Sequence, residues 1–336
     1  MIPADVDTLL DPGWLSRHLA SIDAFDRIVA VERVDSLTTI ADKLRFAVQV
    51  EGPDGERSIP LCAKAHFSNA LNSLGTEAHA YRELHPFIPV RTPRAHYVGI
   101  DAESDRAMIV MDDVLARGGQ ILDAHHPYSV DTCRESLTQL ALLHATTWNG
   151  RRWDVEWLAP RFLATASVFA PDVLQGLLHD GRGEGIEPVL LDAGNLLAAV
   201  QRTAELPATC VLHGDTHSGN AFVQADGALG WLDWQITQRG HWSVDVAYHL
   251  GTVLDVDTRR AHEAELLGHY LDQLAAAGAP APSFDVAWEA YAAGFAWGYL
   301  LWAITRISSR EVVLVHFPRL ATAMADHETY ARLAVA

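Results

Sequence analysis

A polar stretch at residues 213–220, His-Gly-Asp-Thr-His-Ser-Gly-Asn, holds side chains that can move protons and bind a cation. Apolar residues precede and follow it, so we expect a loop held between buried elements. Asp215 is a candidate general base, and Asn220 lies five residues after it. The residue types and their spacing make this loop a candidate catalytic site.

A hairpin signal follows this loop. Asp226 and Gly227 form a turn dipeptide between two apolar segments, which is typical of a β-hairpin. If the hairpin is centred on that dipeptide, Asn220 and Asp233 stand at the same end of it. Together with Asp215 they would offer three hard oxygen groups, a set that suits Mg²⁺ held jointly by protein side chains and substrate phosphates.

The same loop allows a zinc interpretation, with His213 and His217 as the ligands. Their four-residue spacing suits a helix, but Gly214 and Gly219 favour a loop, and no Glu follows His213 as it does in zinc proteases. We therefore interpret His213 as a buried structural residue.

The elements that must position these residues divide the chain into two parts. The first third reads as strands crossed by one helix: strands within 28–50, at 58–66, near 96–100 and near 107–111, with a helix at 69–85. The remainder reads as helices at 131–148, 188–203, 258–277 and 284–305, with strand-like sequence only around 210–234. We expect an α+β fold with a small β-rich lobe at 1–111 and a larger helical lobe at 112–336.

Composition narrows the class of protein. The 336 residues carry a net charge of −18, which disfavours nucleic acid or an anionic membrane as a partner. The three cysteines share no short spacing, no secretory signal is visible, and the longest uncharged run, between Glu289 and Arg306, is short for a membrane span. These features predict a soluble cytoplasmic protein.

Only two of the 25 basic residues are lysines, Lys43 and Lys64. Lys64 lies in an apolar strand, where a compact ammonium can serve as a point charge on phosphate. Lys43 is the rival for this role. We assign the role to Lys64, so we expect loss of Lys64 to impair nucleotide use and loss of Lys43 to do little.

The run His213-Gly214-Asp215, followed by Asn220 and Asp233, resembles the signature of the aminoglycoside phosphotransferase and choline kinase-like family. The resemblance implies a protein-kinase-like fold with two lobes. It also implies that Asp215 is the catalytic base and that Asn220 and Asp233 hold Mg²⁺ on the nucleotide phosphates.

Further positions match the same family. Lys64 corresponds to the strand lysine that binds phosphates, Glu77 to its helix partner, and Met111-Asp112 to the segment that contacts the adenine. Asp245 corresponds to the residue that supports the catalytic loop. One departure concerns residues 37–41, which contain no glycine where protein kinases use a glycine-rich flap.

The expected reaction is transfer of the γ-phosphoryl group of ATP or GTP to a hydroxyl of a small molecule. The aromatic segment 291–302 is either a buried core helix or a wall of the acceptor pocket, formed by some of Trp297, Tyr299 and Trp302. The second interpretation favours a bulky apolar alcohol. The alternatives are an aminoglycoside or other antibiotic kinase and a nucleotide-binding pseudokinase, while the absence of an Ala-Pro-Glu motif disfavours a protein kinase.

Overall fold

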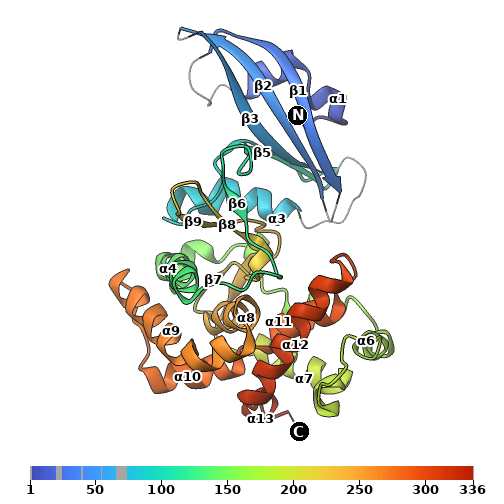
Figure 1. Ribbon diagram of the computed structural model, residues 1–336, viewed down its shortest axis with the longest axis vertical. Coiled ribbons are helices and arrows are strands. Elements are labelled where there is room, and N and C mark those ends of the chain that lie inside the picture. Colours follow the sequence, from blue (N-terminus) through green and yellow to red (C-terminus); the bar gives the residue numbers. More distant parts are fainter. Residues whose placement is uncertain (1, 20–24, 39–40, 54, 66–73, 336) are drawn as a thin grey trace. The chain divides into compact units, whose positions relative to one another are not determined.

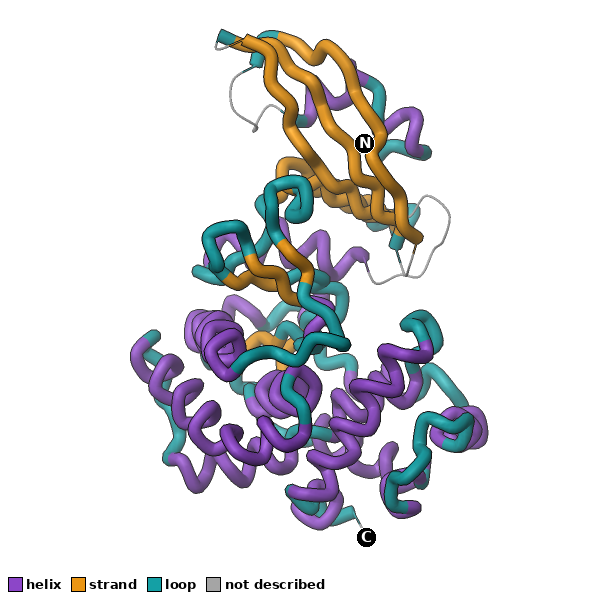
Figure 2. The backbone as a smooth tube through the Cα atoms, in the orientation of Figure 1, coloured by secondary structure: helices purple, strands orange, loops and turns teal. Residues whose placement is uncertain are grey.

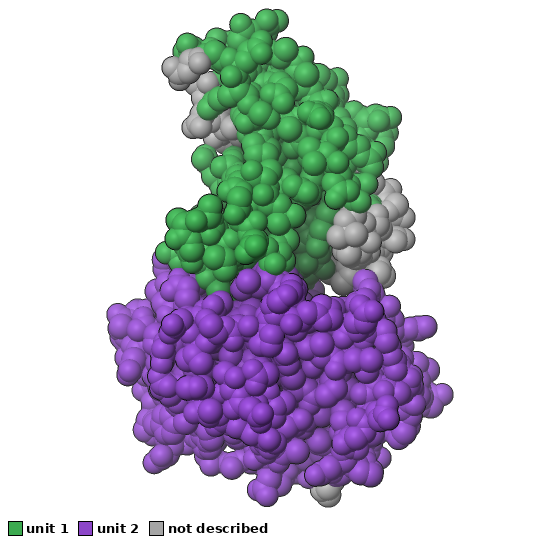
Figure 3. Space-filling view, in the orientation of Figure 1, with its two compact units in different colours: residues 1–87, 91–121, 222–235 green, residues 88–90, 122–221, 236–336 purple. Residues whose placement is uncertain are grey.

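The computed structural model describes residues 2–19, 25–38, 41–53, 55–65 and 74–335. The chain forms two compact units, which Figure 3 colours separately: unit 1 (residues 1–87, 91–121 and 222–235) and unit 2 (residues 88–90, 122–221 and 236–336). Strands make up most of unit 1 and helices most of unit 2 (Figure 2). The expected α+β fold is confirmed.

The units differ from the predicted division at residue 111. Residues 112–121 and 222–235 both belong to unit 1. These two segments are joined by a small sheet in the order β6-β8-β9, in which β6 pairs antiparallel with β8. Its strands are β6 (Gln120–Ile121), β8 (Ala221–Val223) and β9 (Leu229–Trp231). A hairpin that is distant in sequence thus supplies part of unit 1.

Unit 1 is built on a five-stranded antiparallel sheet in the order β1-β2-β3-β5-β4. Figure 1 labels β1, β2, β3 and β5 of this sheet. Its strands are β1 (Arg27–Thr38), β2 (Asp42–Gly52), β3 (Gly55–Ala65), β4 (Ala95–Asp101) and β5 (Arg106–Asp112). Buried and half-buried residues alternate along β2, the period expected of a strand with one face on a core. On β1, Val29 and Val34 are exposed instead, and the register shifts twice in this strand.

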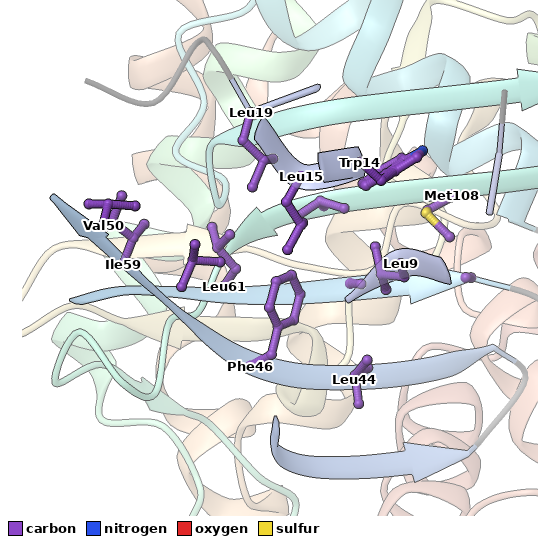
Figure 4. Packing of buried hydrophobic residues seen from close by; sticks show 14 residues of the cluster. Leu9, Trp14, Leu15, Leu19, Leu44, Phe46, Val50, Ile59, Leu61 and Met108 are labelled. Carbon is purple, nitrogen blue, oxygen red and sulfur yellow. The ribbon is translucent and has the colours of Figure 1, made fainter. Parts of the chain in front are cut away.

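One face of this sheet is covered by two short helices, α1 (Val6–Leu9) and α2 (Pro12–His18). Asp5 and Asp11 cap their N-termini by accepting backbone N–H groups. Leu15 of α2 lies above Phe46 of β2 in the buried cluster of Figure 4. This packing leaves the opposite face of β2 and β3 to the polar residues described below.

The predicted helix at 69–85 is described only from Leu74: α3 (Leu74–His79) continues into a π-helical turn (Ala80–Leu84), and residues 69–73 lie outside the described part. Glu77 of α3 is buried in unit 1. The helix therefore presents a carboxylate to the interior.

Unit 2 contains a two-stranded sheet, β7 (Cys210–Leu212) with β10 (Gln238–Gly240), and ten of the α-helices found in the described part of the chain. In chain order these helices are α4 (Val130–Thr147), α5 (Phe162–Ala166), α6 (Pro171–Leu178), α7 (Ala193–Ala204), α8 (Ser243–Val253), α9 (Val256–Ala276), α10 (Phe284–Ala293), α11 (Ala296–Ile304) and α12 (Arg310–Asp326), followed by the single turn α13 (Thr329–Arg332). None of the described helices is long and apolar enough to cross a membrane.

The single helix predicted at 284–305 is two helices, α10 and α11. They meet at Gly294, where a Cβ atom would lie 2.6 Å from the carbonyl oxygen of Ser243 in α8. Only glycine permits this close approach, and its low helix propensity makes it a natural place for the break.

Candidate active site

Lys64 is the centre of a buried ion cluster in unit 1. Its Nζ donates to Glu77 Oε2 at 2.5 Å and to Asp233 Oδ1 at 3.0 Å. Burial alone would lower the pKa of this ammonium, but the two carboxylates outweigh burial and raise it above its ordinary value. The lysine is therefore charged at neutral pH. The structure brings together Lys64, its predicted helix partner Glu77 and the predicted metal ligand Asp233.

A cavity of about 250 Å³ in unit 1 opens onto this cluster. Lys64, Glu77, Met111, Asp112 and Asp233 all line it. Its remaining lining residues are Asp35, Ser36, Lys43, Arg45, Cys62, Tyr81, Pro93, Asp113, Val114, Leu115, Ile121 and Leu232. The cavity thus combines an apolar part with several charges, a combination common in small-molecule sites.

Met111 and Asp112 lie at the end of β5, where the sequence analysis placed the adenine contact. Tyr81 donates its hydroxyl to Met111 Sδ at 3.6 Å, and His96 Nε2 lies 2.7 Å from Asp112 Oδ1. The next residue, Asp113, accepts a hydrogen bond of 2.8 Å from Arg45 Nε. These contacts fix the side chains around this part of the cavity.

Asp233 has a left-handed backbone, with φ of 61°. This region is unfavourable for residues other than glycine, although Asp and Asn adopt it more readily than most. Asp233 follows Leu232, another cavity residue, and the side chain remains 24% exposed. The strained turn therefore holds a carboxylate at the cavity while leaving it accessible.

The loop at 213–220 belongs to unit 2 and rests on Asp245 of α8. One carboxylate oxygen of Asp245 accepts the backbone N–H of His213 at 2.7 Å, and the other accepts that of Gly214 at 2.9 Å. His144 Nε2 lies 3.2 Å from Oδ2. Gly214 has φ of 86°, and a Cβ there would lie 2.3 Å from Ile236 O. Asp245 and the glycine together fix the course of the loop.

Asp215 keeps 27% of its side chain exposed within this loop. Tyr248 donates to its Oδ1 at 2.9 Å, and His217 Nε2 lies 3.8 Å from its Oδ2. His217 Nδ1 accepts the N–H of Gly219, so the neutral ring carries its proton on Nε2, facing Asp215. Burial and the nearby carboxylate raise the pKa of Tyr248 well above its usual value, which keeps the phenol a donor.

Asn220 is held next to the same residue. Its Nδ2 donates to the carbonyl oxygen of Asp215 at 2.9 Å, which leaves Oδ1 as the atom that can bind a cation. The hairpin predicted to pair it with Asp233 exists, although Gln224 N bonds Ala228 O, which shifts the pairing by one residue. Asn220 lies in unit 2 and Asp233 in unit 1, so convergence of the three oxygen groups stays a prediction.

The three aromatic residues suggested for an acceptor pocket have different surroundings in unit 2. Trp297 and Tyr299 are fully buried, and each donates to a backbone carbonyl, Gly214 O at 2.8 Å and Leu190 O at 3.0 Å. Trp302 packs edge-on against His217, with the ring centroids 5.3 Å apart. Of the three, Trp302 contacts a residue that itself faces Asp215.

Sequence reasoning missed Tyr248 and His217 as neighbours of Asp215, and it set Lys43 aside. His217 was considered only as a zinc ligand. Tyr248 stands three residues after Asp245, so both belong to one face of a helix that supports the loop. That spacing is the sequence signal for the tyrosine. For Lys43, the sequence signal of a possible role is that it is one of only two lysines among the 25 basic residues.

The chain is similar to known proteins in family and in fold. A model of the phosphotransferase enzyme family matches residues 36–293. No curated protein matches the chain. Among solved structures, Plasmodium vivax ethanolamine kinase is 12% identical with a TM-score of 0.54, and the match covers 89% of this chain and 83% of that one. The GDP complex of aminoglycoside 2′-phosphotransferase-IIIa is 14% identical with a TM-score of 0.51, covering 94% and 99%. A choline/ethanolamine kinase family protein from Mesorhizobium loti is 16% identical with a TM-score of 0.50, covering 91% of each chain. These likenesses establish the fold.

Proposed function

The chain belongs to the phosphotransferase enzyme family and is a small-molecule phosphotransferase, and from this premise we propose that it moves the γ-phosphoryl group of ATP or GTP to a hydroxyl. The observation that carries the proposal is the cluster of Lys64, Glu77 and Asp233 at one cavity. A charged lysine held by two carboxylates beside an apolar recess suits a nucleotide, with phosphates at the lysine and the base against Met111.

The proposed roles in unit 1 follow from the contacts. Glu77 holds the ammonium group of Lys64 in place and charged, so that this group can contact the α- and β-phosphates. Met111 and Asp112 would border the base. Phosphoryl transfer needs little covalent chemistry from the protein, so positioning and charge account for most of its rate enhancement.

In unit 2, Asp215 would take the proton of the acceptor hydroxyl. Its Oδ1 already accepts from Tyr248, so Oδ2 is the atom available for that proton. The acceptor oxygen then bonds to the γ-phosphorus, the bond from that phosphorus to the β-bridging oxygen breaks, and the nucleoside diphosphate leaves. His213 and Asp245 hold the loop in place and touch neither substrate.

Each of the two residues predicted to hold Mg²⁺ carries an oxygen ligand of the kind that this cation prefers. Asn220 offers an amide oxygen and Asp233 an accessible carboxylate, both hard ligands. Within the described residues, no three His, Cys, Asp or Glu side chains gather into a protein-only metal site. A cation shared with nucleotide phosphates needs no such group. Bound there, it would neutralise charge on the phosphates.

For the acceptor, the contacts favour Trp302 as the aromatic residue beside the hydroxyl site and Trp297 and Tyr299 as packing residues. A bulky apolar alcohol remains our preferred acceptor, with an aminoglycoside or another antibiotic as the alternative.

The experiment is a screen of alcohols, sugars and antibiotics with ATP and GTP, reading nucleoside diphosphate release. Asp215→Asn should lower kcat by at least ~10² with little change in nucleotide affinity. Asp172→Asn, at an exposed position in α6, is the matched control and should behave as wild type. Transfer that survives in Asp215→Asn would refute the base assignment, and nucleotide binding without transfer to any acceptor would favour a pseudokinase.

A further inference from the structure

Both lysines of the chain line the same cavity. The sequence has 25 lysines and arginines, and the only two lysines, Lys43 and Lys64, are both found among the cavity residues of unit 1. Arginine meets the need for positive charge elsewhere in the chain. Lysine differs from arginine because its ammonium group is a compact charge with three donors on a flexible side chain, whereas the guanidinium group is planar. The chain has lysine at these two positions only.

The two residues are a directly opposed pair across β2 and β3. Opposed residues on antiparallel strands point to the same face of the sheet. Their neighbours Leu44 and Ala63 are also paired and are buried, on the other face. The backbone register therefore aims both ammonium groups at the cavity face.

Asp233 receives one lysine on each oxygen. Lys64 Nζ lies 3.0 Å from Oδ1, and Lys43 Nζ lies 3.7 Å from Oδ2. Like charges placed opposite each other in a sheet normally destabilise it. Here Glu77 and Asp233 balance the two ammonium groups. A neutral residue at position 43 would remove the repulsion and leave Asp233 paired with Lys64, so the ion cluster itself does not require the second ammonium group.

The side chain of Lys43 is more exposed and less tightly bound than that of Lys64. Its side chain is 32% exposed, against 5% for Lys64, and its contact with Asp233 is longer. An exposed ammonium on a long stem can turn toward a ligand with little loss of packing. If Asp233 binds a cation, its charge is shared and Lys43 becomes available to an anion.

We propose that Lys43 is a second phosphate-binding cation, which with Lys64 grips the terminal phosphates of a nucleoside di- or triphosphate. This inference rests on the proposed function, and it replaces the expectation from sequence that loss of Lys43 does little, because Lys43 opposes Lys64 and contacts Asp233. Lys43 is the second residue of β2 and follows closely after the glycine-free residues 37–41, of which 37 and 38 end β1 and 39 and 40 lie outside the described part. A lysine side chain here would supply the phosphate contact that a glycine-rich flap makes with backbone N–H groups.

The test measures the affinities of ATP, ADP and AMP by calorimetry, with Mg²⁺, for the wild type and for Lys43→Ala, Lys43→Gln and Lys43→Arg. Lys43→Ala and Lys43→Gln should weaken ATP and ADP binding about tenfold or more and change AMP binding less than about twofold. Lys43→Arg, which keeps the charge, should recover part of the loss. Arg27→Ala removes an equal charge from an exposed pair with Glu51 on the same sheet and should change none of the three.

The possible results separate the role of Lys43 from the proposed function. Equal effects on ATP, ADP and AMP, or no effect, would overturn the phosphate role of Lys43 while leaving the proposed function intact. A wild type that binds no nucleotide would overturn both. If Lys43→Ala does not fold, the comparison of Lys43→Gln with Lys43→Arg decides, because both keep the length of the stem, and equal ATP affinities in these two would overturn the inference.

Discussion

The phenol of Tyr248 donates a 2.9 Å hydrogen bond to Oδ1 of Asp215, and the tyrosine ring is almost completely buried. Tyr248 lies one turn along α8 from Asp245, which holds the loop that carries Asp215. One helix therefore fixes both the backbone of the loop and the side chain of the proposed base. Tyr248 is a positioning residue, because it acts on the substrate only through Asp215.

Tyr248→Phe should lower kcat about tenfold and leave the KM of the nucleotide unchanged. A hydrogen bond to a charged group contributes roughly 1.5–3 kcal/mol, and its loss lets the carboxylate rotate away from the acceptor hydroxyl. Steady-state kinetics with varied nucleotide measure the split between kcat and KM. Tyr291→Phe is the matched control, since Tyr291 is also buried in unit 2 and donates to a carboxylate, Glu263, at 2.8 Å. Equal kinetic losses in the two variants would reduce Tyr248 to a structural residue.

Asp233→Ala should abolish transfer, and raising the Mg²⁺ concentration should not restore it, because the ligand itself is gone. The same change removes a partner from each lysine of the cavity. Activity titrated against Mg²⁺ is the measurement. Asp226→Ala, in the exposed turn of the same hairpin, should keep wild-type activity. Recovery of Asp233→Ala at high Mg²⁺ would place this carboxylate outside the metal site.

Acid should destabilise the protein through His249. This side chain is fully buried, with Nδ1 2.7 Å from Thr216 O and Nε2 2.6 Å from Ser136 Oγ. Burial lowers its pKa to about 4, and the charge of His213 lowers it further, while the Thr216 carbonyl and the charge of Asp245 act in the opposite direction.

Between pH 6.5 and about 4 the unfolded chain therefore carries a proton on His249 that the folded chain does not. Unfolding takes up that proton, so the free energy of unfolding falls as the pH falls, by about 2 kcal/mol at pH 5 from this group. Urea unfolding at pH 7 and pH 5 measures the difference. His249→Gln should show a smaller drop than wild type, and His125→Gln, at an exposed position, the full drop. An undiminished drop in His249→Gln would assign the acid sensitivity to other groups.

The sequence predicted local structure best where a residue pattern had a single physical cause. Alternation along β2 predicted a strand because one of its faces is buried. The polar, glycine-containing stretch 213–220 between apolar segments predicted a loop, and within this loop the Asn220 side chain donates to the backbone carbonyl of Asp215. The sequence was least informative about tertiary partners. Nothing local to Lys43 shows that it opposes Lys64, because register depends on where the intervening turn falls.

Two other features of the fold were not predicted from the sequence, because they too depend on tertiary contacts or are too short to give a pattern. The covering helices α1 and α2 are only four and seven residues long, too short for periodicity to reveal, although Asp5 and Asp11 are good capping residues. The break between α10 and α11 depends on the backbone of α8, which Gly294 approaches closely. Apolar residues continue through that break, so hydrophobic pattern alone predicts one helix.

The aromatic residues of α11 allow a last prediction. Trp297 and Trp302 are five positions apart, so their side chains point about 140° away from each other around the helix. Trp297 donates its indole N–H to Gly214 O, whereas Trp302 packs against His217, beside Asp215. Trp302→Ala should therefore raise the acceptor KM more than about tenfold and spare the KM of ATP, since an aromatic contact contributes a few kcal/mol.

Trp297→Phe and Tyr299→Phe should instead lower the thermal midpoint, because each leaves a buried carbonyl without its donor, and the acceptor KM of the folded protein should stay as in wild type. Acceptor KM and thermal unfolding of all three variants make the comparison. If Trp302→Ala loses stability and its acceptor KM does not move, α11 is packing along its whole length. A polar acceptor would then be the better expectation, because no aromatic residue of this helix would be left to bind an apolar alcohol.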